Sequence, residues 1–133
     1  MKFKVDIRRV YDEAQANEGY RVLVDRLWPR GLSRREVQFD IWCKDLAPST
    51  ELRKWFAHKP EHWEQFGKDY QTQLRTEEQL QRIKELIRNA HAKHMTLLYS
   101  AHDTTHNHAV ILAKEIARVA GRMKAPNGNR EPA

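Results

Sequence analysis

The sequence predicts a single α/β domain, in which a small and at least partly parallel central sheet is flanked by helices. Two apolar runs, YRVLVDRLW at 20–28 and MTLLYSA at 95–101, are suited to strands that are covered on both faces. Around these runs, apolar residues recur at helical spacing. The chain has 133 residues, enough for one such core, and we expect the domain to span residues 1–120.

The expected elements begin with strands. Residues 3–10, FKVDIRRV, alternate apolar and polar side chains, which is typical of a strand with one buried face, and we place it toward a sheet edge. The polar segment 11–20 then connects to the apolar strand at 20–28. Pro29 cannot donate a ladder hydrogen bond, so this second strand is expected to end at the turn WPRG.

Helices are expected next along the chain. Ser33 and Glu36 have the spacing of a capping box, which predicts a short helical turn. Ser49, Pro60 and Thr76 each precede apolar residues at helical spacing and are expected to begin three longer helices. A last helix is expected after the strand at 95–101. The apolar faces of these four helices comprise Leu52, Trp55, Phe56, Trp63, Phe66, Tyr70, Leu74, Leu80, Ile83, Ile87, Ala109, Leu112, Ala113, Ile116 and Val119.

Cysteine content and hydropathy indicate a soluble cytoplasmic protein. Cys43 is the only cysteine, so no internal disulfide can form, and the start MKFKVDIRR lacks the apolar stretch of a signal peptide. No window is apolar enough to span a membrane. Cys43 lies beside Lys44 but has no base in its motif, so we interpret it as structural. No cofactor is predicted.

The positive charge of the chain is concentrated in two segments. The formal net charge is +6. Residues 21–35 contain five arginines and one aspartate, which gives +4. Residues 122–133 contain two arginines and one lysine against one glutamate, which gives +2. The segment 121–133 is also rich in Gly, Pro and Asn, and we expect it to be a flexible basic tail.

Polar and cationic side chains follow the two apolar strands. Ligands of parallel sheets gather beyond the carboxyl ends of the strands, where the loops WPRG and SAHDTTHN are expected to lie side by side. Arg26 and Arg30 match the oxygens of a phosphate or carboxylate. Ser100 and Asn107 lie beside a helix N-terminus, which favours negative charge. The sequence therefore predicts a pocket for a phosphate-like anion or a nucleotide.

A structural explanation competes with this pocket. Arg26 can instead form an ordinary ion pair with a carboxylate such as Asp25 or Asp40. The pocket and the ion pair differ in whether the charge of Arg26 is already satisfied within the fold.

Trp28 lies between Arg26 and Arg30 in the sequence. It is the aromatic residue expected to form a wall against a base or another planar ligand.

The histidines of the last loop allow two interpretations. His102, His106 and His108 are of the type that binds zinc, but their spacing matches no strong metal motif, so no metal is predicted. His108 is placed at a helix start that can direct it toward a bound anion, and histidine titrates near neutral pH. It is the candidate catalytic residue, although the sequence leaves open whether the protein is an enzyme.

Three stretches resemble the YeaO-like family of uncharacterised bacterial proteins: RVLVDRLWPRG, the segment 42–54, and TLLYSAHDTTHNHAVILA. The resemblance covers about residues 7–118 and implies membership without naming an activity. With the family's motif positions added, the predicted ligand-binding residues are Arg26, Trp28, Arg30, Ser49, Arg53, Tyr99, Ser100 and Asn107. Related proteins of the wider superfamily carry Cys-His-Arg where this chain reads Asn107-His108-Ala109, so thiol chemistry is not carried over.

Three functions therefore remain open at the level of sequence. The leading hypothesis is a small anion-binding protein, with His108 as the proton donor or acceptor if a reaction occurs. The second is a nucleic-acid-binding module that uses the arginines of 21–35 and the basic tail. The third is a structural or regulatory protein-binding domain. The substrate and the oligomeric state are left open.

Overall fold

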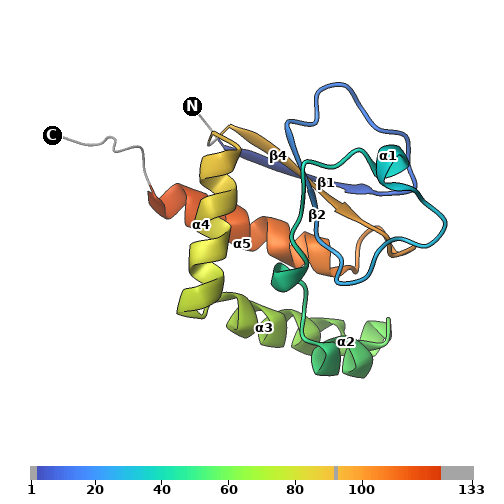
Figure 1. Cartoon of the computed structure of the whole chain (residues 1–133). Helices are drawn as coiled ribbons and strands as arrows, with labels where there is room; N and C mark the ends of the chain where they lie inside the picture. The colour runs from blue at the N-terminus through green and yellow to red at the C-terminus, as the bar shows by residue number, and fades with distance from the viewer. Residues whose placement is uncertain (1–2, 92, 124–133) are drawn as a thin grey trace, which may run out of the picture.

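The sheet of the protein is parallel throughout. The computed structural model describes residues 3–91 and 93–123. Its strands are β1 (Lys4–Arg9), β2 (Tyr20–Leu23), β3 (Ile41–Trp42) and β4 (His94–Tyr99). They form one sheet in the order β1-β4-β2-β3, and each neighbouring pair is parallel. The predicted α/β class is confirmed, and β1 lies at a sheet edge as expected (Figure 1).

Five helices accompany the sheet in the part of the chain that the structure describes. They are α1 (Arg34–Val37), α2 (Thr50–Phe56), α3 (Trp63–Leu74), α4 (Glu77–Asn89) and α5 (His108–Met123), with short 3-10 turns at Lys44–Leu46 and Pro60–His62. Ser33, Ser49 and Thr76 begin α1, α2 and α4 as predicted, and each accepts a backbone N–H three residues on. The expected tail begins inside α5, and residues 124–133 lie outside the described residues.

The chain crosses the sheet in two opposite directions. It passes over β4 on the way from β1 to β2, and it returns from β3 past β2 to reach β4. Crossovers between parallel strands are almost always right-handed, so opposite directions require opposite faces of the sheet. Helices α2 to α5 accordingly lie on one side, and the segment 10–19 lies with α1 on the other (Figure 1).

Alternation along the strands divides the core between these two faces. Val22 and Val24 pack with the larger cluster, to which α2 to α5 contribute. Leu23, between them, packs with Leu98 and Val37 in a smaller cluster on the other face. All of these side chains are buried, and burying each of them stabilises the fold by about 1.5–3 kcal/mol. The expectation that this strand is covered on both faces is confirmed.

Two details of the sheet differ from the prediction. β3 was not predicted, because a strand of only two residues is too short to show a period in the sequence. The predicted second strand also ends earlier, since β2 stops at Leu23 instead of at the WPRG turn. The N–H of Val24 still donates to Leu98 O at 3.1 Å. The chain then leaves the sheet, which frees Asp25 and Arg26 to form a loop.

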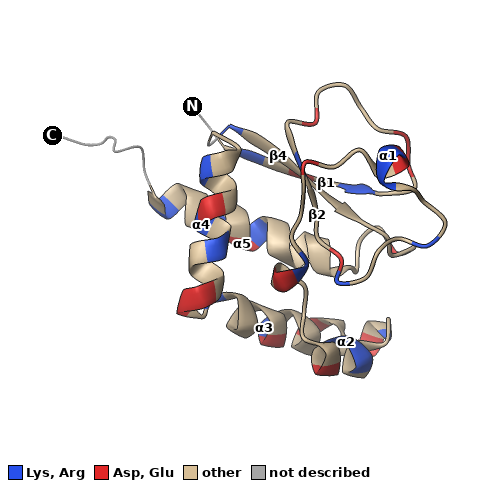
Figure 2. Cartoon of the chain, in the orientation of Figure 1, with Lys and Arg blue, Asp and Glu red and all other residues tan. Residues whose placement is uncertain are grey.

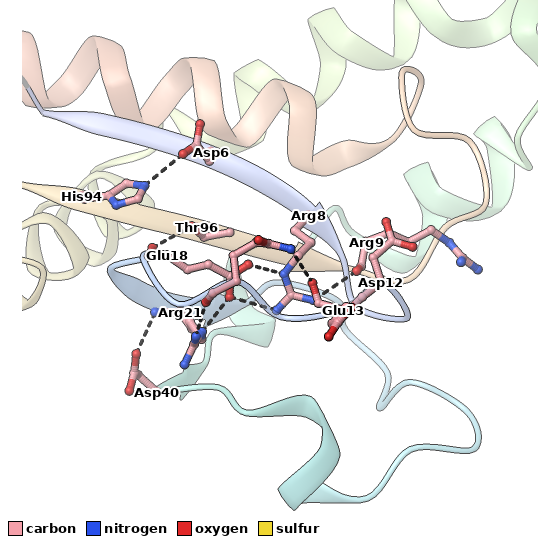
Figure 3. Close-up of polar contacts among 11 residues, drawn as sticks. Asp6, Arg8, Arg9, Asp12, Glu13, Glu18, Arg21, Asp40, His94 and Thr96 are labelled. Carbon is pink, nitrogen blue, oxygen red and sulfur yellow. Dashed lines mark hydrogen bonds and ion pairs between the residues drawn. The ribbon is translucent and has the colours of Figure 1, made fainter.

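A buried glutamate holds the connection between β1 and β2 (Figure 3). Glu18 is only 5% exposed and accepts hydrogen bonds from Arg8 and from Arg21, the latter at 2.7 Å. Its carbonyl oxygen accepts from Thr96 Oγ1 at 2.7 Å, which ties the connection to β4. Gly19 follows with a φ of +70°, and a Cβ there would lie 2.5 Å from His94 O, so only glycine fits.

The arginines of residues 21–35 do not form one basic surface. Arg21 pairs with the buried Glu18, and the guanidinium of Arg34 lies over the rings of Trp28 and Phe39 at 5.7 and 5.1 Å. Figure 2 shows Lys and Arg interleaved with Asp and Glu along the helices.

Within the described part of the chain, no helix is long and apolar enough to cross a membrane.

Candidate functional site

A cavity of about 680 Å³ lies at the carboxyl ends of the strands. Segments that follow each of the four strands line it, including both of the loops that the sequence predicted to meet. Its wall comprises Arg9, Tyr11, Asp25, Arg26, Leu27, Trp28, Pro29, Arg30, Ala47, Pro48, Arg53, Phe56, His58, Phe66, Ser100, Ala101, His102, Asn107 and His108. A volume of this size is typical of small-molecule sites.

Arg26 is the central cationic group of the wall. Its Nη2 donates to Ala47 O at 3.3 Å and to Pro48 O at 3.1 Å. Its Nε is buried and has no hydrogen-bond partner among the described residues. A buried N–H without a partner is unfavourable by about 1–3 kcal/mol, and more when the group is charged. The guanidinium is therefore ready to donate to a further acceptor.

Neither carboxylate suggested by the sequence pairs with Arg26. Asp25 Oδ2 accepts from Ser100 N at 3.0 Å and also from Ser100 Oγ. Asp40 Oδ2 accepts from Arg21 N at 2.7 Å. No ion pair of Arg26 is found within residues 3–91 and 93–123, so the carboxylate partner of the structural explanation is not present there, and the partners of this arginine are Ala47 O and Pro48 O.

Asp25 joins Ser100 to His108 on the floor of the cavity. His108 Nε2 lies 3.0 Å from Val24 O and 3.5 Å from Asp25 Oδ1. Burial lowers the pKa of His108, and the attraction of Asp25 opposes this shift only in part. A carbonyl oxygen can only accept, so the neutral ring carries its proton on Nε2 and keeps Nδ1 as a proton acceptor.

The lowered pKa of His108 predicts a loss of stability in mild acid. The folded protein resists protonation that the unfolded chain accepts below the ordinary value of 6.5, so the free energy of unfolding falls as the pH drops from there toward the folded pKa. His108→Gln keeps an N–H donor for Val24 O and should remove this part of the pH dependence. Urea unfolding above and below about pH 6.5 measures it; parallel losses in both proteins would contradict the assignment.

Arg30 and Arg53 stand at the rim. Both side chains are exposed and line the cavity. Within the described part of the chain, neither guanidinium makes a hydrogen bond or an ion pair. Together with Arg9 and Arg26 they place four arginines on the wall, against the single carboxylate of Asp25. The cavity is therefore cationic.

Two predicted residues on the cavity wall, Trp28 and Asn107, have structural partners of their own. Trp28 lines the cavity, but its indole N–H donates to Leu32 O at 2.7 Å and its ring packs edge-on against Phe39 and Trp42. Asn107 is 2% exposed, and its side chain accepts from Val110 N at 3.3 Å at the start of α5. Its amide also donates to Asp103 O at 2.9 Å.

Ser49 and Tyr99 are not on the cavity wall. Ser49 Oγ accepts from Leu52 N at 3.2 Å and from Gln73 Nε2 at 3.0 Å, so it caps α2. Tyr99 is the buried last residue of β4, and burial raises the pKa of its phenol. Direct ligand contact by these two residues stays a prediction, and the hydrogen bonds of Ser49 hold the start of α2 against α3.

Arg9 and Tyr11 belong to the wall but were not predicted. Arg9 Nε donates to Ala101 O at 3.0 Å, and its guanidinium lies 4.7 Å from the centre of the Tyr11 ring. Tyr11 OH donates to Arg30 O at 2.8 Å, which connects β1 to the Trp-Pro turn. Their sequence signal was their position at the carboxyl end of a strand, where Arg9 ends β1 and Tyr11 follows it, but this signal becomes informative only once the strand order is known. His58 was likewise missed.

The cysteine and the remaining histidines do not add a second reactive centre. Burial, together with Asp45, raises the pKa of Cys43 to about 11, so the thiol is protonated near neutral pH. His106 contacts Asp103 and the ring of Trp63. Among the described residues, no three His, Cys, Asp or Glu side chains are grouped as a metal would require.

Comparison with known proteins identifies the family. A family profile described as the inactive DUF488-N3 subclade matches residues 4–133. The chain belongs to this family. The chain is 45% identical over 109 residues to the uncharacterized protein YeaO of Escherichia coli, covering 82% of this chain and 93% of YeaO.

A second relative matches the chain over a similar length. The chain is 36% identical over 111 residues to the uncharacterized protein Rv3073c of Mycobacterium tuberculosis, covering 84% of this chain and 92% of the relative. No solved structure matches the chain significantly. The resemblance to the YeaO-like family is thus confirmed, and the function of the family is unknown.

Proposed function

We propose that the protein binds a small phosphate-bearing ligand in the cavity at the carboxyl ends of the strands. The observation that carries the proposal is Arg26, whose buried Nε has no partner among the described residues and whose charge no described carboxylate pairs. Phosphate oxygens accept hydrogen bonds from guanidinium groups in a matching plane. Arg30 and Arg53 at the rim would attract the anion and contact its outer oxygens.

Binding is favoured over covalent catalysis as the main activity. The family description calls this subclade inactive, and the buried Asn107 stands where the wider superfamily is expected to carry a cysteine. Asn107 has no nucleophilic atom to replace a thiol. If the bound ligand reacts, His108 Nδ1 is the atom that we expect to exchange a proton. The single cysteine of the chain suits a reducing cytoplasm, where we place this function.

The arrangement of charge favours a small ligand over a nucleic acid. A module that tracks a nucleic-acid backbone needs a continuous row of cations. Arg21 is occupied by Glu18 and Arg34 is stacked on aromatic rings, so the basic segment is divided between separate tasks. Arg26 instead lines a cavity, where a small anion can approach its side chain more readily than a duplex can.

Thermal melting at two salt concentrations tests the proposal. The panel is inorganic phosphate, pyrophosphate, ribose 5-phosphate, the four common nucleoside monophosphates and a short single-stranded DNA. A ligand of the native state at a hundred times its Kd adds about 2.7 kcal/mol to the free energy of unfolding. We expect a small phosphate compound to raise the melting temperature at both salt concentrations. A rise with DNA alone, lost at high salt, would instead indicate a nucleic-acid-binding module.

A further inference from the structure

Exposed apolar side chains gather at the mouth of the cavity. The described residues include three exposed large hydrophobic side chains, Tyr11, Leu27 and Trp55. The ring of Trp55 is covered on one face by His62, whose ring lies parallel to it at 4.0 Å. Tyr11 and Leu27 are 40% and 66% exposed, and both line the cavity. Contact with an apolar part of the ligand would remove their surface from water.

Tyr11 is held in the position of a stacking platform. Its hydroxyl is anchored on Arg30 O at 2.8 Å, which limits the tilt of the ring. The guanidinium of Arg9 lies over the ring at 4.7 Å and is itself fixed on Ala101 O at 3.0 Å. The ring of Tyr11 is therefore already ordered, and stacking a planar group on it would cost little side-chain entropy of Tyr11.

The phosphate site and this platform belong to different strands. Tyr11 follows β1 and Arg26 follows β2, and β4 lies between these two strands. Neighbouring strands are about 4.8 Å apart, so the two strands are separated by roughly 10 Å. Tyr11 and Arg26 therefore enter the cavity wall from different strands. The cavity of about 680 Å³ has room for a larger molecule that joins a planar group to a phosphate.

We infer that the ligand is a nucleoside phosphate, whose base stacks on Tyr11 and whose phosphate is bound by Arg26. This inference rests on the proposed function, because it needs the phosphate at Arg26. A sugar phosphate has no planar apolar group to cover Tyr11 and Leu27. A nucleobase has such a face, and it stacks well on a tyrosine ring. Trp28 was the aromatic residue expected in this role, but its ring is engaged with Phe39 and Trp42.

Calorimetric titration compares the base with the phosphate directly. Dissociation constants are measured for AMP, GMP, CMP, UMP and ribose 5-phosphate. We expect at least one nucleoside monophosphate to bind the unaltered protein about 10-fold more tightly than ribose 5-phosphate, as is typical of one stacked base. Tyr11→Leu should abolish this difference by weakening the binding of the nucleotide far more than that of ribose 5-phosphate. Tyr11→Phe keeps the ring, and it should keep most of the preference.

The outcomes separate this inference from the proposed function. Equal affinity of the unaltered protein for ribose 5-phosphate and for all four nucleotides would overturn the role of the base, while phosphate binding would stand. An equal loss of affinity for both kinds of compound in Tyr11→Leu would reduce Tyr11 to a structural residue and also overturn the inference. If none of the five compounds binds, both proposals fail. The comparison within the unaltered protein needs no variant, so a folding defect in Tyr11→Leu leaves the test intact.

Discussion

Arg26→Met is expected to abolish binding of phosphate compounds while leaving the protein folded. Removing one partner from a buried, hydrogen-bonded charge pair typically weakens binding by 2–5 kcal/mol, so we expect the Kd to rise at least about 30-fold. Methionine has a similar length and needs no hydrogen-bond partner. The variant loses the stabilising hydrogen bonds to Ala47 O and Pro48 O. It also removes the destabilising effect of a guanidinium whose buried Nε has no partner among the described residues. The free energy of unfolding should therefore change by no more than about 1 kcal/mol.

Arg35→Met is the matched control for this experiment. Arg35 lies in α1, is exposed and does not line the cavity. Its substitution by methionine removes the same charge as Arg26→Met. Titration calorimetry should give this variant nearly the affinity of the unaltered protein. Equal weakening by both substitutions would show that general positive charge, and not the cavity, governs binding. Unfolding of Arg26→Met would point to a structural role for Arg26.

Glu18→Gln should produce the largest loss of stability. Glu18 is the single carboxylate between Arg8 and Arg21, and its side chain is 5% exposed. Removing its charge leaves two cations close together with weaker acceptors. Breaking a buried ion pair in this way typically costs about 3–5 kcal/mol, and we expect about 3 kcal/mol in the free energy of unfolding. Urea unfolding, with the midpoint and the slope both fitted, measures this change.

Glu13→Gln is the control on the same connection. Glu13 is exposed, and its side chain takes no part in the ion pairs of the described residues. It should change the free energy of unfolding by less than about 0.5 kcal/mol. A similarly small effect of Glu18→Gln would show that the ion pairs at Glu18 do not stabilise the connection.

The same glutamate also gives the protein an acid limit. Burial acts to raise the pKa of Glu18, but the hydrogen bonds from Arg8 and Arg21 outweigh it and hold the pKa below the ordinary value of 4.5. The stabilisation is complete above that value and is lost as the pH falls from there through the lowered pKa. This loss should be smaller in Glu18→Gln, which has no carboxylate to protonate at this position.

The longer elements could be predicted because their sequence patterns are local. The strand Tyr20–Leu23 is apolar on both faces, and Thr76 caps a helix with a regular apolar face, so neither element depends on distant residues for its pattern. The two-residue strand Ile41–Trp42 has no such pattern. It forms because Leu23 O accepts from Cys43 N at 2.8 Å, a contact between residues 20 positions apart.

The candidate site could be predicted only in part, for a related reason. Arg26 and His108 directly follow recognisable strands or begin a helix, so the rule about carboxyl ends places them together. Arg9 ends β1 and Tyr11 follows it, and nothing local in the sequence shows that β1 neighbours β4. Arg26 is a candidate for ligand binding because no carboxylate pairs with it among the described residues. Whether Asp25 pairs with Arg26 or with Ser100 is decided by tertiary packing, which the spacing of residues does not encode.

The most direct measurement of the central claim is an NMR titration of the arginine Nε–H groups with AMP, GMP, CMP and UMP in turn. The resonance of Arg26 is assigned by its absence from the spectrum of Arg26→Met, and that of Arg35 serves as the exposed reference. We predict that the Arg26 resonance shifts progressively and saturates with at least one of the four, because the phosphate binds to the guanidinium of Arg26. The Arg35 resonance should stay in place. Binding of a nucleotide with no shift at Arg26, or no binding of any of the four, would contradict the account.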